Sequence, residues 1–140
     1  MNVISRKNRK LISKLLESIS KPARLQILLA IGEDEACVCH LEAVLGYRQA
    51  YISQHLMTLR ENGVLDTRRE GRYVFYRLRD KRILKIIQEA GAVAGLPTED
   101  MQPRKRMEKY SDCGCPNCQP LLQVEHLTDQ FEVPSSKVKE

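Results

Sequence analysis

A mainly α-helical protein with one small β-hairpin is predicted by three features of the sequence. Segments with apolar residues at helical spacing recur along the first half of the chain and end at glycines. Two of these segments, 38–45 and 48–62, are separated by a short turn, as in a helix-turn-helix. After them, 64–69 and 72–78 are rich in Val, Leu, Tyr and Phe and flank a Glu-Gly pair, which indicates a hairpin. The predicted fold is a winged helix-turn-helix.

Two helices are expected before this pair. Residues 8–20 carry Leu and Ile at helical spacing with lysines alongside, so this helix is amphipathic. Pro22 suits the first turn of a second helix, which ends around Gly32. The acidic residues 33–35 follow. We interpret them as a solvated loop, with a contribution to a cation site as the alternative.

The second helix of the pair separates an apolar face from a polar one. Its apolar positions Ile52, Leu56 and Leu59 recur at spacings of four and three, and Gly63 suits the helix end. The polar face is therefore expected to meet double-stranded DNA, since Gln, Arg and Ser side chains reach base edges and phosphates. The candidates for this contact are Arg48, Gln49, Ser53, Gln54, His55 and Arg60. The alternative is an ordinary solvated helix face.

The predicted wing is basic, with tyrosines interleaved. Its candidate phosphate contacts are Arg68, Arg69, Arg72 and Tyr73. A basic hairpin that serves solubility alone is the other interpretation.

A homodimer is predicted from an excess of apolar surface. Asp80 is expected to cap a helix over 81–94 that carries a broad apolar band. A domain this small has too little core to bury both this band and the apolar face of 8–20, so a second protomer is expected to cover them. Twofold symmetry would place two recognition helices about 34 Å apart, as a palindromic operator requires.

Length, composition and charge divide the chain in two. Residues 1–97, the predicted winged domain, hold 17 Lys or Arg against 10 Asp or Glu, whereas the extension 98–140 holds 6 against 8. The excess of basic charge therefore lies where DNA is expected. The polar stretch after residue 95 is interpreted either as an extended segment or as a short helix over 104–110. The apolar segment 121–131 is expected to fold on the dimer surface. No apolar run is long enough for a membrane span or a signal peptide, so we expect a cytoplasmic protein.

The motifs resemble a known family. The run CVCHLEAVLG, followed by SQHLMTLRENGVLDTRREGRYVFYRL, is similar to the ArsR/SmtB family of metal-responsive winged-helix repressors. The resemblance covers roughly residues 8–90. It implies a homodimer that binds operator DNA when metal-free and releases it when a thiophilic metal or metalloid binds.

The candidate ligands of such an ion are the cysteines. They are Cys37, Cys39, Cys113, Cys115 and Cys118. Side chains at i and i+2 of a regular helix point roughly 160° apart, so the first two thiols share an ion only if that helix end is extended or distorted. We expect such a distortion to shift the recognition helix. The alternative is that Cys37 is a small buried hydrophobe.

The family pattern has a third cysteine where this chain has Glu42, and often an aspartate where it has His40. Two thiolates are too few for a soft ion, so the C-x-C-x-x-C tail is expected to supply the rest, preferably from the partner subunit. The alternative is a separate tail site, either a scavenging loop or a zinc knot completed by His126. Arsenic(III) or antimony(III) is the preferred inducer, then cadmium or lead, with zinc as a further possibility. The family's other metal site, which needs histidines on the last helix, is not expected, because Arg82 occupies the first histidine position.

Two other functions use the same thiols. A thiol-redox repressor would join Cys37 or Cys39 to the tail by a disulfide. A small thiol oxidoreductase built on Cys115 and Cys118 is disfavoured, because the chain lacks the strand-helix alternation of a thioredoxin-like domain. We therefore expect no enzymatic activity.

Overall fold

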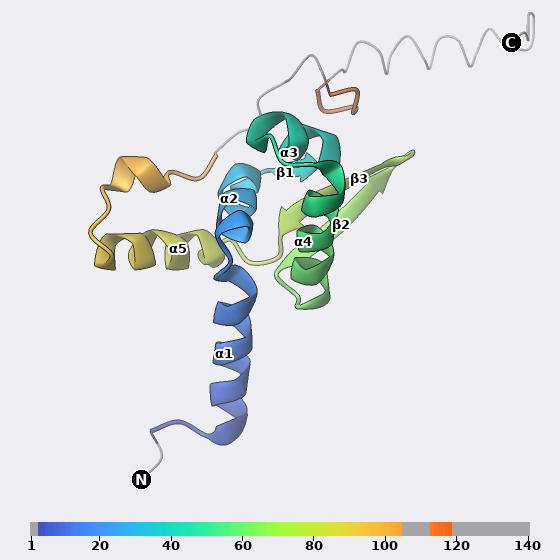
Figure 1. Cartoon of the computed structure of the whole chain (residues 1–140). Helices are drawn as coiled ribbons and strands as arrows, with labels where there is room; N and C mark the ends of the chain where they lie inside the picture. Colours follow the sequence, from blue (N-terminus) through green and yellow to red (C-terminus); the bar gives the residue numbers. More distant parts are fainter. Residues whose placement is uncertain (1–2, 105–112, 119–140) are drawn as a thin grey trace, which may run out of the picture.

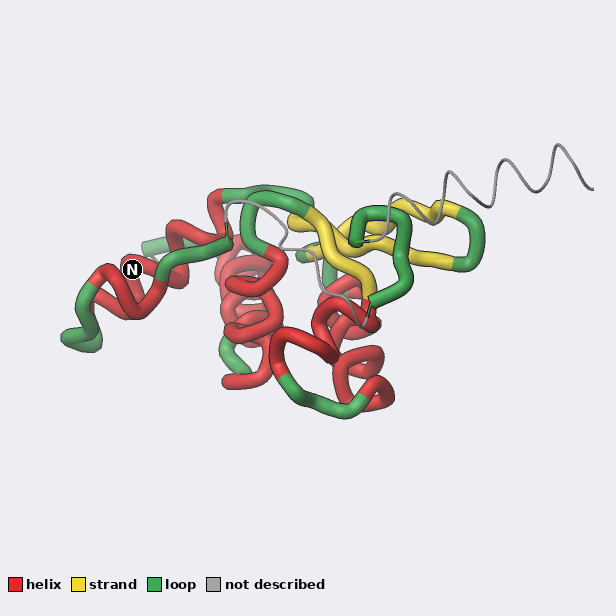
Figure 2. Tube along the Cα trace, turned by 90° about the horizontal axis from the view of Figure 1, so that it is seen from above, coloured by secondary structure: helices red, strands yellow, loops and turns green. Residues whose placement is uncertain are grey.

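The computed structural model describes residues 3–104 and 113–118 of the 140-residue chain. It is mainly helical, with a small antiparallel sheet at one side of the helices and a hairpin whose tip projects beyond them (Figures 1 and 2). The elements are α1 (Arg6–Ile19), α2 (Pro22–Ile31), β1 (Glu35–Cys37), α3 (Val38–Leu45), α4 (Gln49–Glu61), β2 (Leu65–Glu70), β3 (Tyr73–Leu78), α5 (Arg82–Val93) and the 3₁₀ helix η1 (Thr98–Met101). The predicted fold class is confirmed.

The sheet holds one more strand than the sequence predicted. Its order is β1-β3-β2, and both pairs are antiparallel. Glu35 of β1 lies opposite Arg77, and Cys37 lies opposite Phe75. The interpretation of 33–35 as a wholly solvated loop is therefore wrong for Glu35. The strand is three residues long, too short for its alternation to be recognised in the sequence.

The core lies between the helices and the sheet. On α4, Ile52, Leu56 and Leu59 are fully buried, as their spacing predicted. They pack with buried apolar residues of α2, α3, the sheet and the first half of α5. This packing fixes α4 against the rest of the domain and leaves its polar face outward.

The ends of the helices follow the predicted signals, with one correction. Gly46 ends α3 in the left-handed conformation, and its N–H donates to the Glu42 carbonyl at 2.9 Å. The residue that caps α5 is Lys81 and not Asp80. Asp80 still accepts the backbone N–H of Arg82 at 3.0 Å and ion-pairs with its guanidinium, which lowers the pKa of Asp80 to about 2.

The first part of the extension packs on the winged domain. Met101 of η1 is buried against α5, so close to Gly91 that a Cβ there would lie 1.6 Å from the Met101 sulfur. Arg104 is held by backbone hydrogen bonds to Leu29 (3.0 Å) and from Glu33 (2.9 Å). The expected helix 104–110, from residue 105 onward, and the segment 121–131 lie outside the described residues, and the division at residue 97 stays a prediction.

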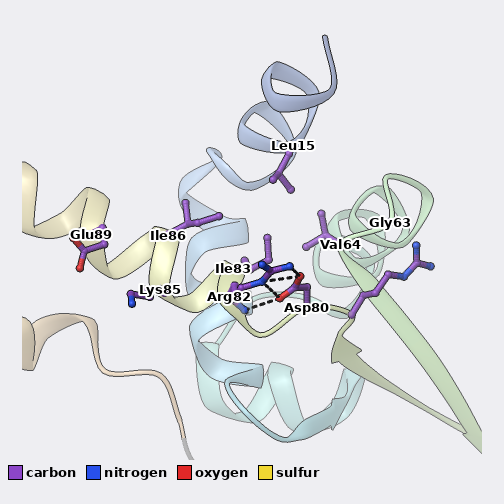
Figure 3. A pocket seen from close by; sticks show the side chains of 10 residues that line it. Leu15, Gly63, Val64, Asp80, Arg82, Ile83, Lys85, Ile86 and Glu89 are labelled. Carbon is purple, nitrogen blue, oxygen red and sulfur yellow. Dashed lines mark hydrogen bonds and ion pairs between the residues drawn. The ribbon is translucent and has the colours of Figure 1, made fainter. Parts of the chain in front are cut away.

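One apolar face of the described chain is uncovered. On α1, Leu11, Ile12 and Leu16 are 59%, 51% and 47% exposed. Beside them, Leu15 of α1 and Ile83 and Ile86 of α5 line a groove of about 730 Å³ (Figure 3). Across 3–104 and 113–118, every helix falls short of the length and apolar content that a membrane crossing requires.

Candidate metal centre and nucleic-acid interface

Three sulfur atoms from distant parts of the chain meet at the junction of β1 and α3. Cys37 ends β1 and caps α3, and Cys39 lies in the first turn of α3. Their sulfurs are 3.1 Å apart. The Cys113 sulfur lies 3.5 Å from that of Cys37 and 2.7 Å from that of Cys39. Three thiols are therefore within reach of one ion.

The two cysteines of the pair face the same point because Cys37 is not helical. Its φ and ψ are −89° and 168°, an extended conformation. A shared ion requires this helix end to be extended or distorted, and the structure has the extended form. No deformation of α3 is needed to bring these sulfurs together. The geometry therefore does not support the expectation that an ion shifts the recognition helix by distorting α3.

The tail residues 113–118 form a compact turn beside α3 and β3. The N–H of Cys118 donates to the Cys115 carbonyl at 3.1 Å. The Cys115 sulfur lies within 4.8 Å of those of Cys37 and Cys113, and all three residues are buried. Phe75, fully buried, and the partly buried Tyr73 pack against this group. Glycine at position 114 suits this packing, because a Cβ there would lie 3.2 Å from the Tyr73 hydroxyl.

Burial keeps two of these thiols protonated when no ion is bound. Removal from water raises the pKa of Cys37, and it raises the pKa of Cys113 to about 11. At neutral pH both therefore carry their protons. Since thiolates are the metal ligands, binding of an ion must release these protons.

Behind the sulfurs, His40 joins the tail turn to the start of the extension. His40 is fully buried on α3, and its Nδ1 lies 3.3 Å from the Cys118 sulfur. Its Nε2 lies 2.8 Å from Nη1 of Arg104. A guanidinium only donates, so Nε2 is the acceptor and the ring proton sits on Nδ1, directed at Cys118. His40 thus holds Cys118 in place and does not present Nδ1 as a free ligand atom.

One carboxylate connects the tail turn to the wing. Glu35 Oε2 accepts from the Asn117 side-chain amide at 3.0 Å, and Oε1 accepts from Nε of Arg68 at 3.1 Å. Arg68 also ion-pairs with Glu70 at 2.8 Å and lies over the Phe75 ring, 4.5 Å from its centroid. The hydrogen bond from Arg68 lowers the pKa of Glu35.

Most of the predicted DNA contacts are exposed along α4 and on the hairpin. The exposed candidates are Arg48, Gln49, Gln54, Arg60, Arg69 and Arg72. Arg48 caps the N-terminus of α4, and Ser53 is half-buried on the same helix. A helix N-terminus with Arg and Gln side chains beside a basic wing is an arrangement that suits a DNA major groove and its flanking phosphates.

Three other candidates are held by contacts within the domain. Nδ1 of His55 accepts from Nε of Arg24 at 3.1 Å, and its ring stacks edge-on with Tyr51. Burial lowers the pKa of His55, and the charges of Arg24 and Lys21 lower it further, so the ring is neutral. Arg68 is ion-paired as described above, and Tyr73 packs on the thiol cluster.

The contacts that surround the thiols were not predicted from the sequence. Glu35 was considered as a possible contributor to a cation site, but its bonds to Arg68 and Asn117 were not foreseen, because these partners are far away in the chain. His40 was noticed as a replacement for aspartate, but its role depends on Arg104, 64 residues later. No signal in the sequence links the two.

Known proteins share this fold and much of this sequence. The family model described as bacterial regulatory protein, arsR family, matches residues 21–67. The biofilm growth-associated repressor of Agrobacterium fabrum is 38% identical over 90 residues, which cover 64% of this chain and 77% of that protein. The chain belongs to the arsR family of bacterial regulatory proteins.

Two further proteins match this arsR-family chain, one by its structure and one by its sequence. HlyU from Vibrio cholerae has a TM-score of 0.58 and 32% identity, with 64% of this chain and 97% of that chain covered. The arsenic resistance transcriptional regulator ArsR1 of Pseudomonas putida is 50% identical over 56 residues, 40% of this chain and 43% of that protein. The fold and the family are those of DNA-binding transcriptional regulators and not of enzymes.

Proposed function

We propose that this protein is a homodimeric repressor that binds operator DNA when ion-free and leaves it when a thiophilic metal or metalloid ion binds. The observation that carries the proposal is the meeting of Cys37, Cys39 and Cys113, with each pair of sulfurs 3.5 Å apart or less. A sulfur-only donor set selects soft ions over magnesium or calcium. The thiols lie beside the strand that carries the wing.

Arsenic(III) or antimony(III) is the inducer that three converging thiols suit best, with cadmium or lead next and zinc after them. Cys115 is the nearest candidate for a fourth ligand. All these donors belong to one chain, so a complete site needs no thiol from the partner subunit. The match to ArsR1 of Pseudomonas putida, a protein named for arsenic resistance, supports the first choice.

The coupling of the thiols to DNA runs through Glu35. Closing the tail turn onto an ion fixes Asn117, which shares the Glu35 carboxylate with Arg68 of the wing. A shift of that carboxylate changes the position or the freedom of Arg68 and its neighbours on β2. We therefore expect ion binding to change the position of the wing and, through it, the affinity for DNA.

The homodimer is supported by the uncovered face of α1 and α5. This face presents apolar side chains to water along both helices and continues into the groove of Figure 3. A patch of this kind on a soluble protein marks a protein contact. Two copies joined there would hold two α4 helices in fixed relation, as a palindromic operator demands.

A thiol-redox repressor is the second candidate, favoured by the 2.7 Å separation of the Cys39 and Cys113 sulfurs. Oxidation by peroxide would remove two protons and two electrons and join these sulfurs. Redox-sensing thiols depend on an accessible thiolate, whereas burial raises the pKa of Cys113 to about 11. This ranks the redox function below the metal function.

The test is fluorescence anisotropy of the reduced protein on DNA from its own promoter region, titrated at fixed salt with arsenite, cadmium, lead and zinc. An allosteric coupling of about 1–3 kcal/mol gives a loss of DNA affinity of about 5- to 150-fold. Release by one of these ions supports the proposal. Release by mild oxidant and by none of the ions replaces it with the redox repressor.

A further inference from the structure

Arg104 places a positive charge behind the thiols. Its Nη1 donates to His40, whereas Nε and Nη2 are buried and have no hydrogen-bond partner among the residues the structure describes. No carboxylate within 3–104 or 113–118 pairs with this guanidinium. Arg104 as a whole is half-buried, but these two nitrogens are shielded from water, and among the described residues no carboxylate offsets their charge.

The backbone around Arg104 is built to keep this charge in place. Gly32 ends α2 with a φ of 59°, and a Cβ at this glycine would lie 1.9 Å from the Arg104 carbonyl oxygen. The absence of a side chain lets residue 104 lie directly on the helix end. Hydrogen bonds to Leu29 and from Glu33 hold it there on both sides. The guanidinium is therefore fixed relative to α3.

The thiol centre is a place close to Arg104 where negative charge can appear, because His40 contacts both Arg104 and Cys118. A ring nitrogen of His40 and the sulfurs of Cys113 and Cys118 lie within 4.8 Å of one another. Arg104 is thus one imidazole ring away from two of the thiols. If those thiols become thiolates around an ion, the charge that remains on the complex decides whether Arg104 gains a partner.

The charge of the complex differs between the candidate ions. Three thiolates around arsenic(III) give a neutral complex. Three or four thiolates around a divalent ion give a net charge of about −1 or −2, because each deprotonated cysteine contributes one negative charge. A fixed positive charge at this range favours the second kind and is indifferent to the first.

We infer that Arg104, acting through His40, is a specificity-determining residue that gives this centre affinity for soft divalent cations such as cadmium(II) and adds none for arsenic(III). The inference rests on the proposed function and concerns the same site. Cys115 or Cys118 supplies the fourth thiolate when a divalent ion binds. The three thiols Cys37, Cys39 and Cys113 suffice for arsenic(III).

The experiment measures ion binding directly, without DNA. The reduced full-length protein is titrated with cadmium(II) against a competing chelator and with arsenite, and both are followed by thiolate charge-transfer absorbance. The variants are Arg104→Met, which removes the charge, and Arg104→Lys, which keeps it. Arg79→Met is the matched control, since Arg79 is an exposed arginine that ion-pairs with Asp66 at 2.9 Å.

Arg104→Met should weaken cadmium binding by about tenfold or more and change arsenite binding by less than about twofold. Arg104→Lys should retain most of the cadmium affinity, and Arg79→Met should change neither. If Arg104→Met weakens the binding of cadmium and of arsenite equally, the role of Arg104 is merely structural. If cadmium binding is unchanged, the charge of Arg104 does not contribute to the affinity for cadmium. Either result overturns the inference while arsenite binding by the parent leaves the proposed function standing. A parent that binds neither ion overturns both.

Discussion

The side-chain amide of Asn117 donates a hydrogen bond to Oε2 of Glu35 at 3.0 Å, although 82 residues separate them. The other oxygen of the same carboxylate accepts from Arg68 at 3.1 Å. The turn that carries the tail thiols and the strand that carries wing arginines thus share one acidic group. Together with the packing of Tyr73 on the thiol cluster, this carboxylate joins the candidate metal centre to the candidate DNA interface.

Replacing Asn117 should therefore separate ion binding from DNA release. In Asn117→Ala the five thiols remain, so ion affinity should change by less than about threefold, while the effect of the ion on DNA affinity should fall by about fivefold or more. Calorimetry of ion binding and anisotropy with and without ion measure the two quantities. Gln102→Ala, which removes an exposed amide bonded to the Thr98 carbonyl, is the control. Unchanged coupling in Asn117→Ala would exclude the route through Glu35.

The tail thiols should differ in their importance for arsenite. Cys113 contacts both members of the pair, whereas Cys118 faces His40. Cys113→Ser should abolish release of DNA by arsenite, and Cys118→Ser should leave it within about threefold of the parent, because the three-sulfur set is intact. Anisotropy titrations of both variants decide this. Equal loss in the two would mean that the arsenic ligands are not the three thiols named above.

The Glu35 carboxylate should make stability depend on pH in the acid range. Its hydrogen bond from Arg68 lowers the pKa of Glu35 below the ordinary 4.5. The contribution is present above about pH 4.5 and is lost as the pH falls through the lowered folded value. Glu35→Gln should thus lower the unfolding free energy by about 1 kcal/mol at pH 7 and by progressively less below pH 4.5. Urea unfolding at pH 7, 5, 4 and 3.5 measures it, and a gap that widens in acid would reverse the sign of the argument.

Sequence reasoning reached the helices and the wing because their signals are local. Ile52, Leu56 and Leu59 mark the buried face of α4 through their spacing, and Gly46 marks the end of α3. The close approach of the Cys37 and Cys39 sulfurs could not be predicted from their spacing, because it depends on the extended backbone at Cys37. That backbone follows from pairing of β1 with β3, a contact between segments about 40 residues apart.

The surroundings of the thiols were beyond prediction for a related reason. In the sequence His40 looks like an ordinary helix residue, because its partner Arg104 comes 64 residues later. That contact depends on the close approach of the Arg104 backbone to Gly32, which we call the Gly32 contact. Each of these residues is unremarkable alone. The cysteines were recognised as candidate ligands from their residue type and spacing. The contacts of the charged and amide side chains around them could not be predicted in this way.

The close packing of the Arg104 backbone on Gly32 can be tested by replacing two glycines. Both Gly32 and Gly46 have positive φ, 59° and 75°, but a Cβ at Gly32 would collide with the Arg104 carbonyl, whereas one at Gly46 meets no atom within 4 Å. Gly46→Ala, in the left-handed helical region, should cost about 1 kcal/mol from backbone strain. Gly32→Ala should cost about 3 kcal/mol, because its ψ of −134° is less accessible to alanine and the clash with Arg104 adds to the strain. Urea unfolding compares them. Equal losses would show that residue 104 moves away at no cost and that Arg104 is not anchored there.

The uncovered face of α1 should control the oligomeric state. Ile12 is 51% exposed on that face, whereas Met57 is 59% exposed on α4. Ile12→Glu places a charge in the proposed interface and should shift the protein from dimer to monomer at micromolar concentration, with DNA affinity reduced about tenfold or more because the two half-sites are then read separately. Met57→Glu, an equal change outside the interface, should leave a dimer. Sedimentation equilibrium separates the cases, and a dimeric Ile12→Glu would place the interface elsewhere.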